Sequence, residues 1–177
     1  MLIMIIIQNV VLCASLNCNI ILKSVCLKLN NVVFKNNRLK CLVIRLRKPF
    51  TTCKLYRTGK LVLLGAKSYE DGRNAIRQVA RKIQKLGYDV QLSNITVVNM
   101  VGSYDYTFNI NLSKLFYVIG SNAVQYNQER FPALIFKTSI CTINVYRTGK
   151  LVIYGGKKPE DLNIAFNELD PFVFESL

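Results

Sequence analysis

Hydrophobic positions along the first half of the chain predict strands that alternate with helices. Short runs of β-branched and apolar residues, bounded by turn residues, are typical of strands. These runs lie at residues 5–13, 32–35, 39–47, 51–56 and 60–66. Apolar residues spaced three and four apart predict helices near residues 20–29 and 69–86, the second with Ser68 as N-cap and Gly87 as its stop signal.

The second half follows the same plan. Strands are predicted at residues 95–103, 131–137, 141–146 and 150–156. A helix near residues 111–118 has a poorer apolar pattern than its first-half counterpart. The last predicted helix, residues 159–169, is shorter than the 69–86 helix and acidic.

A sequence repeat explains this shared plan. The heptad at residues 56–62 returns ninety positions later at residues 146–152, and Asn9 lines up with Asn99 at the same offset. So long a period is too large for a solenoid unit and predicts two copies of one module, residues 1–90 and 91–177, packed as a pseudo-twofold pair. A two-fold protein surface suits duplex DNA.

The strands at residues 60–64 and 150–154 are apolar on both faces. Helices are expected to cover one face, which leaves four side chains on a bare side: Val62, Leu64, Val152 and Tyr154. A large bare apolar face usually marks an interaction site. The alternative is a core with two sides, which a chain of this length has few elements to build.

Charge adds a second kind of surface. The net charge is +14 without any histidine, and the basic excess lies wholly in residues 1–90, which favours phosphate or an acidic protein as partner. On the 69–86 helix a basic row steps by four along the face opposite the apolar stripe: Arg73, Arg77, Arg81 and Lys85. The row is interpreted as partner-binding, because like charges in a row repel one another. The alternative is a merely solvated surface.

Several functions are excluded or disfavoured by composition. The chain has no histidine for general-base work and no Cys/His couple, so we do not expect an enzyme. Its six cysteines form no C-x-x-C pair, so they are interpreted as ordinary thiols in a reducing compartment, and neither a metal nor a cofactor is expected. The apolar start, residues 1–7, is predicted to be a strand rather than a signal peptide or membrane span, and the chain is expected to be soluble and intracellular.

Several motifs resemble the core of the TATA-box-binding protein family. They include the two repeats, the Thr-Gly-Lys turns, and residues 65–68, 84–87, 98–103 and 130–135. Residues 46–49 and the tail 171–176 resemble its TATA-binding-protein-like factor branch. The resemblance implies an α+β fold in which both repeats form one saddle-shaped, curved antiparallel sheet with helices on the convex face. It also implies a nuclear protein whose concave side sits on the DNA minor groove.

The resemblance also implies a set of DNA-binding residues. The first repeat supplies Asn9, Val11, Leu39, Arg45, Tyr56, Lys60, Val62 and Leu64. The second repeat supplies Asn99, Val101, Phe131, Lys137, Tyr146, Lys150, Val152 and Tyr154.

Some of these residues depart from the family pattern. Tyrosines replace a phenylalanine at each pair of wedge positions, where Leu39 joins Tyr56 and Phe131 joins Tyr146. Leu64 and Tyr154 replace groove threonines, while Lys54 and Asn144 replace groove leucines. These changes predict attraction to the DNA backbone with relaxed or altered TATA specificity.

The resemblance also implies partner proteins for this chain. The basic row fits transcription factor IIA, and Glu129 lies where the family binds transcription factor IIB. A homodimer through the concave face is a further expectation. Two functional hypotheses follow. The first is a minor-groove core-promoter factor that recruits these partners and the RNA polymerase II machinery. The second is a protein adaptor with little sequence-specific DNA binding.

Overall fold

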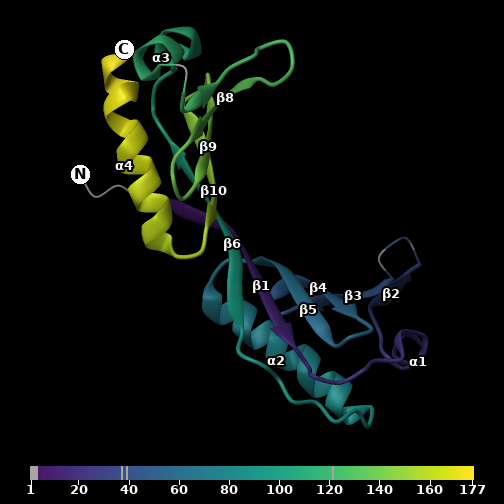
Figure 1. Cartoon of the computed structure of the whole chain (residues 1–177). Coiled ribbons are helices and arrows are strands. Elements are labelled where there is room, and N and C mark those ends of the chain that lie inside the picture. The colour runs from purple at the N-terminus through teal and green to yellow at the C-terminus, as the bar shows by residue number, and fades with distance from the viewer. Residues whose placement is uncertain (1–3, 37, 39, 121) are drawn as a thin grey trace. The chain divides into compact units, whose positions relative to one another are not determined.

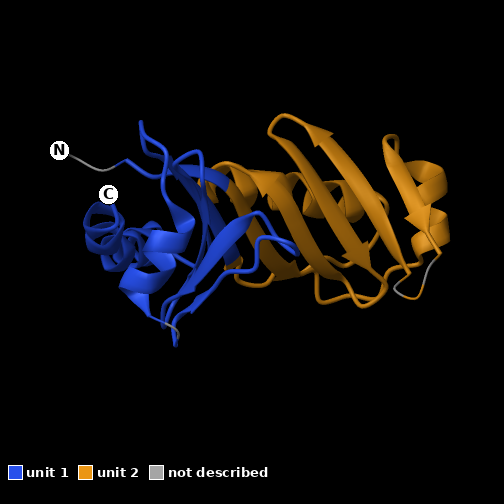
Figure 2. Ribbon diagram, turned by 90° about the horizontal axis from the view of Figure 1, so that it is seen from above, with its two compact units in different colours: residues 1–8, 99–177 blue, residues 9–98 orange. Residues whose placement is uncertain are grey.

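The computed structural model describes residues 4–36, 38, 40–120 and 122–177. It divides into two compact units, residues 9–98 and residues 1–8 with 99–177, which Figure 2 shows in separate colours. Among the described residues, no helix is both long enough and apolar enough to cross a membrane. All six cysteines carry free thiols.

The unit of residues 9–98 is an antiparallel sheet with the strand order β2-β3-β4-β5-β1. The elements that lie wholly or mostly in it, labelled in Figure 1, are β1 (Ile6–Ser15), α1 (Leu22–Lys28), β2 (Val32–Lys35), β3 (Cys41–Arg47), β4 (Phe50–Tyr56), β5 (Lys60–Ala66) and α2 (Tyr69–Lys85). Helix α2 packs on β4 and β5, and α1 packs on β2 and β3.

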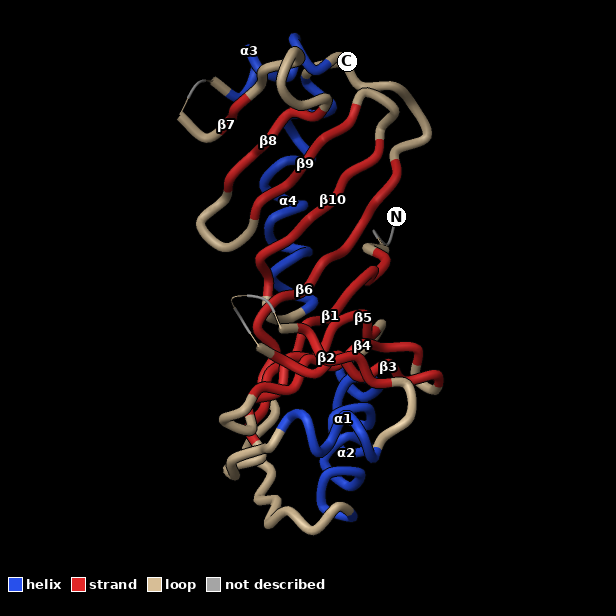
Figure 3. The backbone as a smooth tube through the Cα atoms, turned by 90° about the vertical axis from the view of Figure 1, so that its right-hand side faces the viewer, coloured by secondary structure: helices blue, strands red, loops and turns tan. Residues whose placement is uncertain are grey.

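The other unit has the same element order and the strand order β6-β10-β9-β8-β7. Its elements are β6 (Thr96–Asp105), α3 (Leu112–Ile119), β7 (Val124–Gln125), β8 (Ala133–Lys137), β9 (Thr142–Tyr146), β10 (Lys150–Gly156) and α4 (Pro159–Glu175). Helix α4 packs on β9 and β10, and Figure 3 shows it behind these strands, with no helix in front of them.

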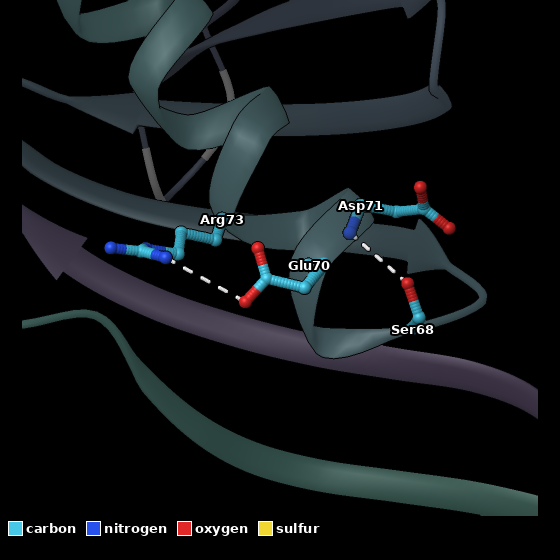
Figure 4. A network of polar contacts seen from close by, with 4 residues as sticks. All are labelled: Ser68, Glu70, Asp71 and Arg73. Carbon is cyan, nitrogen blue, oxygen red and sulfur yellow. Dashed lines mark hydrogen bonds and ion pairs between the residues drawn. The ribbon is translucent and has the colours of Figure 1, made fainter.

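Helix α2 forms where its sequence signals predict. The Ser68 hydroxyl accepts a hydrogen bond from the Asp71 backbone N–H at 3.1 Å, which satisfies one of the free N–H groups of the first turn (Figure 4). The helix ends before Gly87, whose φ of +91° suits glycine and stops the helix. Its apolar stripe, Ile76, Val79, Ala80 and Ile83, is buried against the sheet.

Helix α4 corrects the prediction that the last helix ends at residue 169. It continues through Pro171 to Glu175 and has 17 residues, as many as α2. A proline inside a helix removes one hydrogen bond and is a common stop signal. Here Leu169 and Val173 are fully buried on either side of it, and this apolar burial offsets the lost hydrogen bond.

Helix α3 forms where the sequence predicts it, and it has a side-chain cap that α1 lacks. The Asn111 side chain accepts a hydrogen bond from the Lys114 backbone N–H at 3.1 Å, whereas α1 has no side-chain cap. Asparagine is among the best N-cap residues, so capping compensates for the weaker apolar pattern. The short strand β7 was not predicted.

The core lies on one face of each sheet. Leu61 and Leu63 of β5 are fully buried, whereas the alternating residues Val62 and Leu64 are only partly buried. The same alternation holds in β10. The prediction of a face without helices is therefore confirmed for these strands, and the alternative of a two-sided core is wrong.

Candidate nucleic-acid interface

The sheet face turned away from α2 brings side chains from four strands into rows. We call it the first open face, and its residues are Val11, Cys13, Arg45, Thr52, Lys54, Tyr56, Val62 and Leu64. Strand register pairs Thr52 with both Arg45 and Leu64, and it pairs Val62 with both Lys54 and Cys13. Apolar groups at the centre therefore continue into cationic groups toward β3 and β4.

The matching face of the other unit has the same rows. This second open face consists of Val101, Ser103, Lys137, Thr142, Asn144, Tyr146, Val152 and Tyr154. Register pairs Val152 with Asn144 and Ser103, and it pairs Tyr154 with Thr142 and Val101. The ninety-residue repeat thus places equivalent positions at equivalent points of the two faces.

Two asparagines make the same hydrogen bond at matching points. The Asn9 Oδ1 atom accepts from the Gly65 backbone N–H at 2.8 Å, and Asn99 Oδ1 accepts from the Gly155 N–H at 3.0 Å. Each bond lies beside a register shift, between Val10 and Leu12 in β1 or between Tyr154 and Gly156 in β10. The shift leaves a glycine N–H without its strand partner, and the asparagine side chain satisfies it.

This bond fixes how each amide is oriented. An asparagine side chain has one oxygen that accepts and one NH₂ group that donates twice. Since the glycine N–H needs an acceptor, the oxygen faces it and the NH₂ donors remain for a ligand. Asn9 and Asn99 are therefore preset as hydrogen-bond donors.

Exposed cations flank both faces. Lys60 and Lys150 begin β5 and β10, directly after Gly59 and Gly149, which have φ values of +80° and +90°. A side chain at either glycine would collide with a backbone carbonyl, that of Cys18 or that of Phe108. The Thr-Gly-Lys turn therefore needs its glycine and delivers each lysine to the start of its strand.

Aromatic side chains lie at the predicted wedge positions. The Phe131 and Tyr146 rings meet edge to face with centroids 6.4 Å apart, and Phe131 is 37% exposed. Tyr56 is paired with Cys41 across β3 and β4, and burial, with the nearby Cys41 and Cys13 thiols, raises its pKa. Leu39, the fourth wedge position, lies outside the described residues.

The basic row lies on the exposed side of α2. Arg73 forms a 3.6 Å ion pair with Glu70, seen in Figure 4. Among the described residues, the other members of the row, Arg77, Arg81 and Lys85, have no acidic group within ion-pair distance. Arg77 and Arg81 line a shallow hollow beside Pro49. The row is thus a mostly uncompensated cationic surface.

Glu129 lies elsewhere, in the loop between β7 and β8. It is exposed, and its backbone N–H donates to Asn127 Oδ1 at 3.2 Å. This hydrogen bond holds the loop locally and leaves the Glu129 carboxylate at the surface.

Six open-face residues are absent from the predicted set of DNA-binding residues: Cys13, Thr52, Lys54, Ser103, Thr142 and Asn144. Cys13 and Ser103 occupy equivalent repeat positions, and Asn144 accepts a hydrogen bond from the Tyr154 hydroxyl at 3.3 Å. The alternation of the strands and the ninety-residue offset identify Cys13 and Ser103 from sequence. No sequence signal gives the Asn144 contact, because it depends on register between β9 and β10.

Comparisons with known proteins agree with this architecture. Residues 4–86 and 94–175 match the family model "Transcription factor TFIID (or TATA-binding protein, TBP)". The TATA-box-binding protein of Candida albicans is 36% identical over 171 residues, covering 95% of this chain and 71% of that protein. TATA-box-binding protein-like 1 of Entamoeba histolytica is 34% identical over 166 residues, covering 93% of this chain and 76% of that protein.

A solved structure gives the same result for the fold. Methanococcus jannaschii TBP matches with a TM-score of 0.84 and 29% identity, covering 97% of this chain and 98% of that one. The expected TATA-binding-protein fold is therefore confirmed. The family is described as a transcription factor, so the prediction that the chain is not an enzyme is also confirmed. On both sequence and fold, the chain belongs to the TATA-binding protein family.

Proposed function

We propose that this chain is a nuclear transcription initiation factor that binds promoter DNA through the minor groove. The observation that carries the proposal is the matched pair of hydrogen bonds from Gly65 and Gly155 to the two asparagine oxygens. They leave amide donors of Asn9 and Asn99 for a ligand. The minor groove of A·T pairs presents acceptors, adenine N3 and thymine O2, to such donors.

Apolar residues beside the asparagines supply selectivity in this proposal. Val11, Val62, Val101 and Val152 line the open faces and offer no hydrogen-bond acceptor. A guanine N2 amino group pressed against them would lose its partner, which favours A·T over G·C. Phosphates would be contacted by Arg45, Lys60, Lys137 and Lys150. The contribution of these contacts to affinity depends on salt concentration and not on base sequence.

The substitutions in the groove support relaxed or altered TATA specificity. Lys54 and Asn144 put polar groups opposite Val62 and Val152 in the open faces, and Leu64 and Tyr154 add bulk beside them. Tyr56 and Tyr146 each bring a hydroxyl to a wedge position, where it needs a hydrogen-bond partner inside a base stack. Sharp, sequence-specific kinking should therefore be weaker than backbone attraction.

Finer assignments belong to the same proposal. The tail motif at residues 171–176 favours the TATA-binding-protein-like branch, and the repeats are assigned to residues 1–90 and 91–177. The basic row on α2 supports docking of transcription factor IIA, and Glu129 supports docking of transcription factor IIB. Through these contacts the chain would recruit the RNA polymerase II machinery. Without DNA, the bare apolar faces would favour a homodimer.

The uncompensated basic row also favours the second hypothesis, a protein adaptor with little sequence-specific DNA binding. Binding of the purified chain to a TATA duplex and to a scrambled duplex, over a salt series, tests both. The proposed factor binds both duplexes at low salt and prefers TATA by about tenfold or less at physiological salt. A much larger preference contradicts relaxed specificity, and no binding at low salt leaves only the adaptor.

The docking surface is tested separately by charge reversal. The double variant Arg77→Glu/Arg81→Glu should lose affinity for transcription factor IIA, because the pair is exposed and faces an acidic partner in this proposal. Lys23→Glu/Lys28→Glu on α1 changes the net charge equally and serves as the matched control. Equal affinity of both variants would remove the basic row as the docking surface.

A further inference from the structure

The two open faces differ at two neighbouring repeat positions, where Asn144 and Tyr154 stand in place of Lys54 and Leu64. We propose that Asn144 and Tyr154 allow the second open face to accept a G·C base pair, while the first open face remains selective for A·T. The inference rests on the proposed minor-groove function and adds to it a specificity-determining pair. The bound DNA site would then be asymmetric, because its two halves would differ in base-pair preference.

The pair is defined by register and by one hydrogen bond. Asn144 lies opposite Val152 and Tyr154 lies opposite Thr142, so the two side chains meet diagonally across β9 and β10. The Tyr154 hydroxyl donates to Asn144 Oδ1 at 3.3 Å. Both side chains are partly buried, so they lie in the open face rather than extending freely into solvent.

This arrangement gives the second face a donor and an acceptor together. The Asn144 oxygen has two acceptor positions, of which the tyrosine hydroxyl occupies one, and the amide NH₂ carries two donors. Guanine presents both its N2 amino group and its N3 acceptor in the minor groove, whereas A·T presents acceptors only. Asn144 can therefore satisfy the guanine amino group that an apolar face leaves unpaired.

The equivalent positions of the first face lack an acceptor. Ninety residues earlier stand Lys54, which only donates, and Leu64, which does neither. The threonines Thr52 and Thr142 occupy matching positions in the two faces and so make no difference between them. A guanine amino group at the first face would find no partner at these positions, and A·T remains preferred there.

A scan of single base pairs tests the inference. The dissociation constant is measured for an A·T-rich duplex and for duplexes in which one A·T pair at a time becomes G·C. For the wild-type chain, a single change to G·C should weaken binding less than about threefold at a group of positions in one half of the site. In the other half, the same change should weaken binding about tenfold or more. The variant Asn144→Leu should raise the loss in the tolerant half to about tenfold.

Two further variants make the test specific. Asn144→Ala removes the same acceptor without adding bulk, so it should abolish tolerance even if the leucine variant is poorly folded. Lys54→Leu removes a positive charge from the other face, so it should lower affinity for every duplex and leave the tolerant half unchanged. Thermal unfolding of each variant confirms that a folded protein is compared.

The outcomes separate this inference from the proposed function. Equal losses in both halves for the wild-type chain, or tolerance that survives in both Asn144 variants, would overturn the specificity pair while leaving minor-groove binding intact. Failure of the wild-type chain to bind any duplex would overturn the proposed function, and the inference with it. Loss of tolerance in Lys54→Leu alone would also contradict the assignment to Asn144.

Discussion

Asn9 and Asn99 show how one side chain can support both the fold and a ligand. Each oxygen accepts the N–H that a glycine cannot give to a neighbouring strand, so the backbone stays satisfied. Each amide nitrogen then has its donors available. The repeat made both residues visible in the sequence, and the family resemblance predicted their role, but the glycine partners depend on register shifts that no residue pattern reveals.

An aspartate at position 99 separates the support of the backbone from the donation of hydrogen bonds to a ligand. In Asn99→Asp the carboxylate oxygen can still accept from Gly155, but the donors are gone and a negative charge faces the DNA. We expect at least about tenfold weaker DNA binding, since a good base contact contributes about 1–3 kcal/mol, with an unchanged melting temperature. The measurement is duplex binding by fluorescence anisotropy, together with thermal unfolding.

The matched control is Asn163→Asp, an exposed position of α4 with the same change of charge. It should bind DNA nearly as the wild-type chain does. Equal losses of DNA affinity in the two variants would show that only the net charge matters. That result would contradict the role of the Asn99 amide as a donor to DNA.

At the scale of elements, the two long helices begin differently although their sequences are repeats. Ser68 caps α2 through its hydroxyl, but the equivalent residue of α4 is Lys158. There the Asp161 carboxylate accepts from the backbone N–H groups of Lys157 and Lys158, at 2.8 Å and 3.0 Å. The Asp161 carboxylate thus binds backbone N–H groups at the start of α4, whereas the Ser68 hydroxyl binds an N–H inside the first turn of α2.

Removal of the α2 cap should destabilise the fold. In Ser68→Ala the Asp71 N–H loses its acceptor, and we expect a loss of about 1 kcal/mol in the free energy of unfolding. Urea unfolding measures it. Ser113→Ala, at an exposed position in the first turn of α3, should cost much less, and an equal cost would contradict the capping role.

The α4 cap should depend on pH. Hydrogen bonds from the Lys157 and Lys158 N–H groups, with their nearby charges, hold the pKa of Asp161 below its ordinary value of 3.8. A lowered pKa means that the stabilisation is present at neutral pH and is lost as pH falls below that ordinary value. Asp161→Ala should therefore melt below the wild type at pH 7, and the gap should shrink in acid.

Thermal unfolding from pH 7 down to pH 3 provides this comparison. Glu168→Ala removes an exposed carboxylate later in the same helix and controls for net charge. If the difference between Asp161→Ala and the wild type stays constant across the acidic range, the carboxylate does not act as the cap.

Strands with clear boundaries were predictable from sequence, and helix ends were less so. Lys60–Ala66 and Lys150–Gly156 form as predicted, because an apolar run follows directly on a Gly-Lys turn. The end of α4 was missed because residue spacing carries no information about the burial of Val173. The contact between Asn144 and Tyr154 was missed because a diagonal contact requires strand register, which residue spacing alone does not supply.

At the scale of the whole molecule, two units with one plan carry different charge. The basic excess lies in residues 1–90, while residues 91–177 are balanced. Lys150 faces Asp105 across β10 and β6, whereas Lys60 faces Ser15 across β5 and β1. Each lysine follows the same turn, but only the first lies opposite an uncharged residue.

Lys60 should therefore contribute more than Lys150 to the salt dependence of DNA binding. Lys60→Ala should reduce the slope of log K against log salt by about one, with an equal loss of affinity for all sequences, because phosphate contacts carry no sequence information. Lys150→Ala should reduce it less, because the carboxylate of Asp105, in the paired register position, would repel the same phosphates. Lys114→Ala on α3 is the control, and a similar slope for all three variants would contradict this account.

The central claim is that DNA lies on the open faces, and a native cysteine tests it directly. Cys13 is partly exposed on the first open face, while Cys26 is partly exposed on α1. Alkylation of the two thiols is followed by mass spectrometry with and without saturating duplex DNA at low salt. The account predicts that DNA slows the modification of Cys13 severalfold and leaves Cys26 unchanged. Equal rates at Cys13 with and without bound DNA would contradict it.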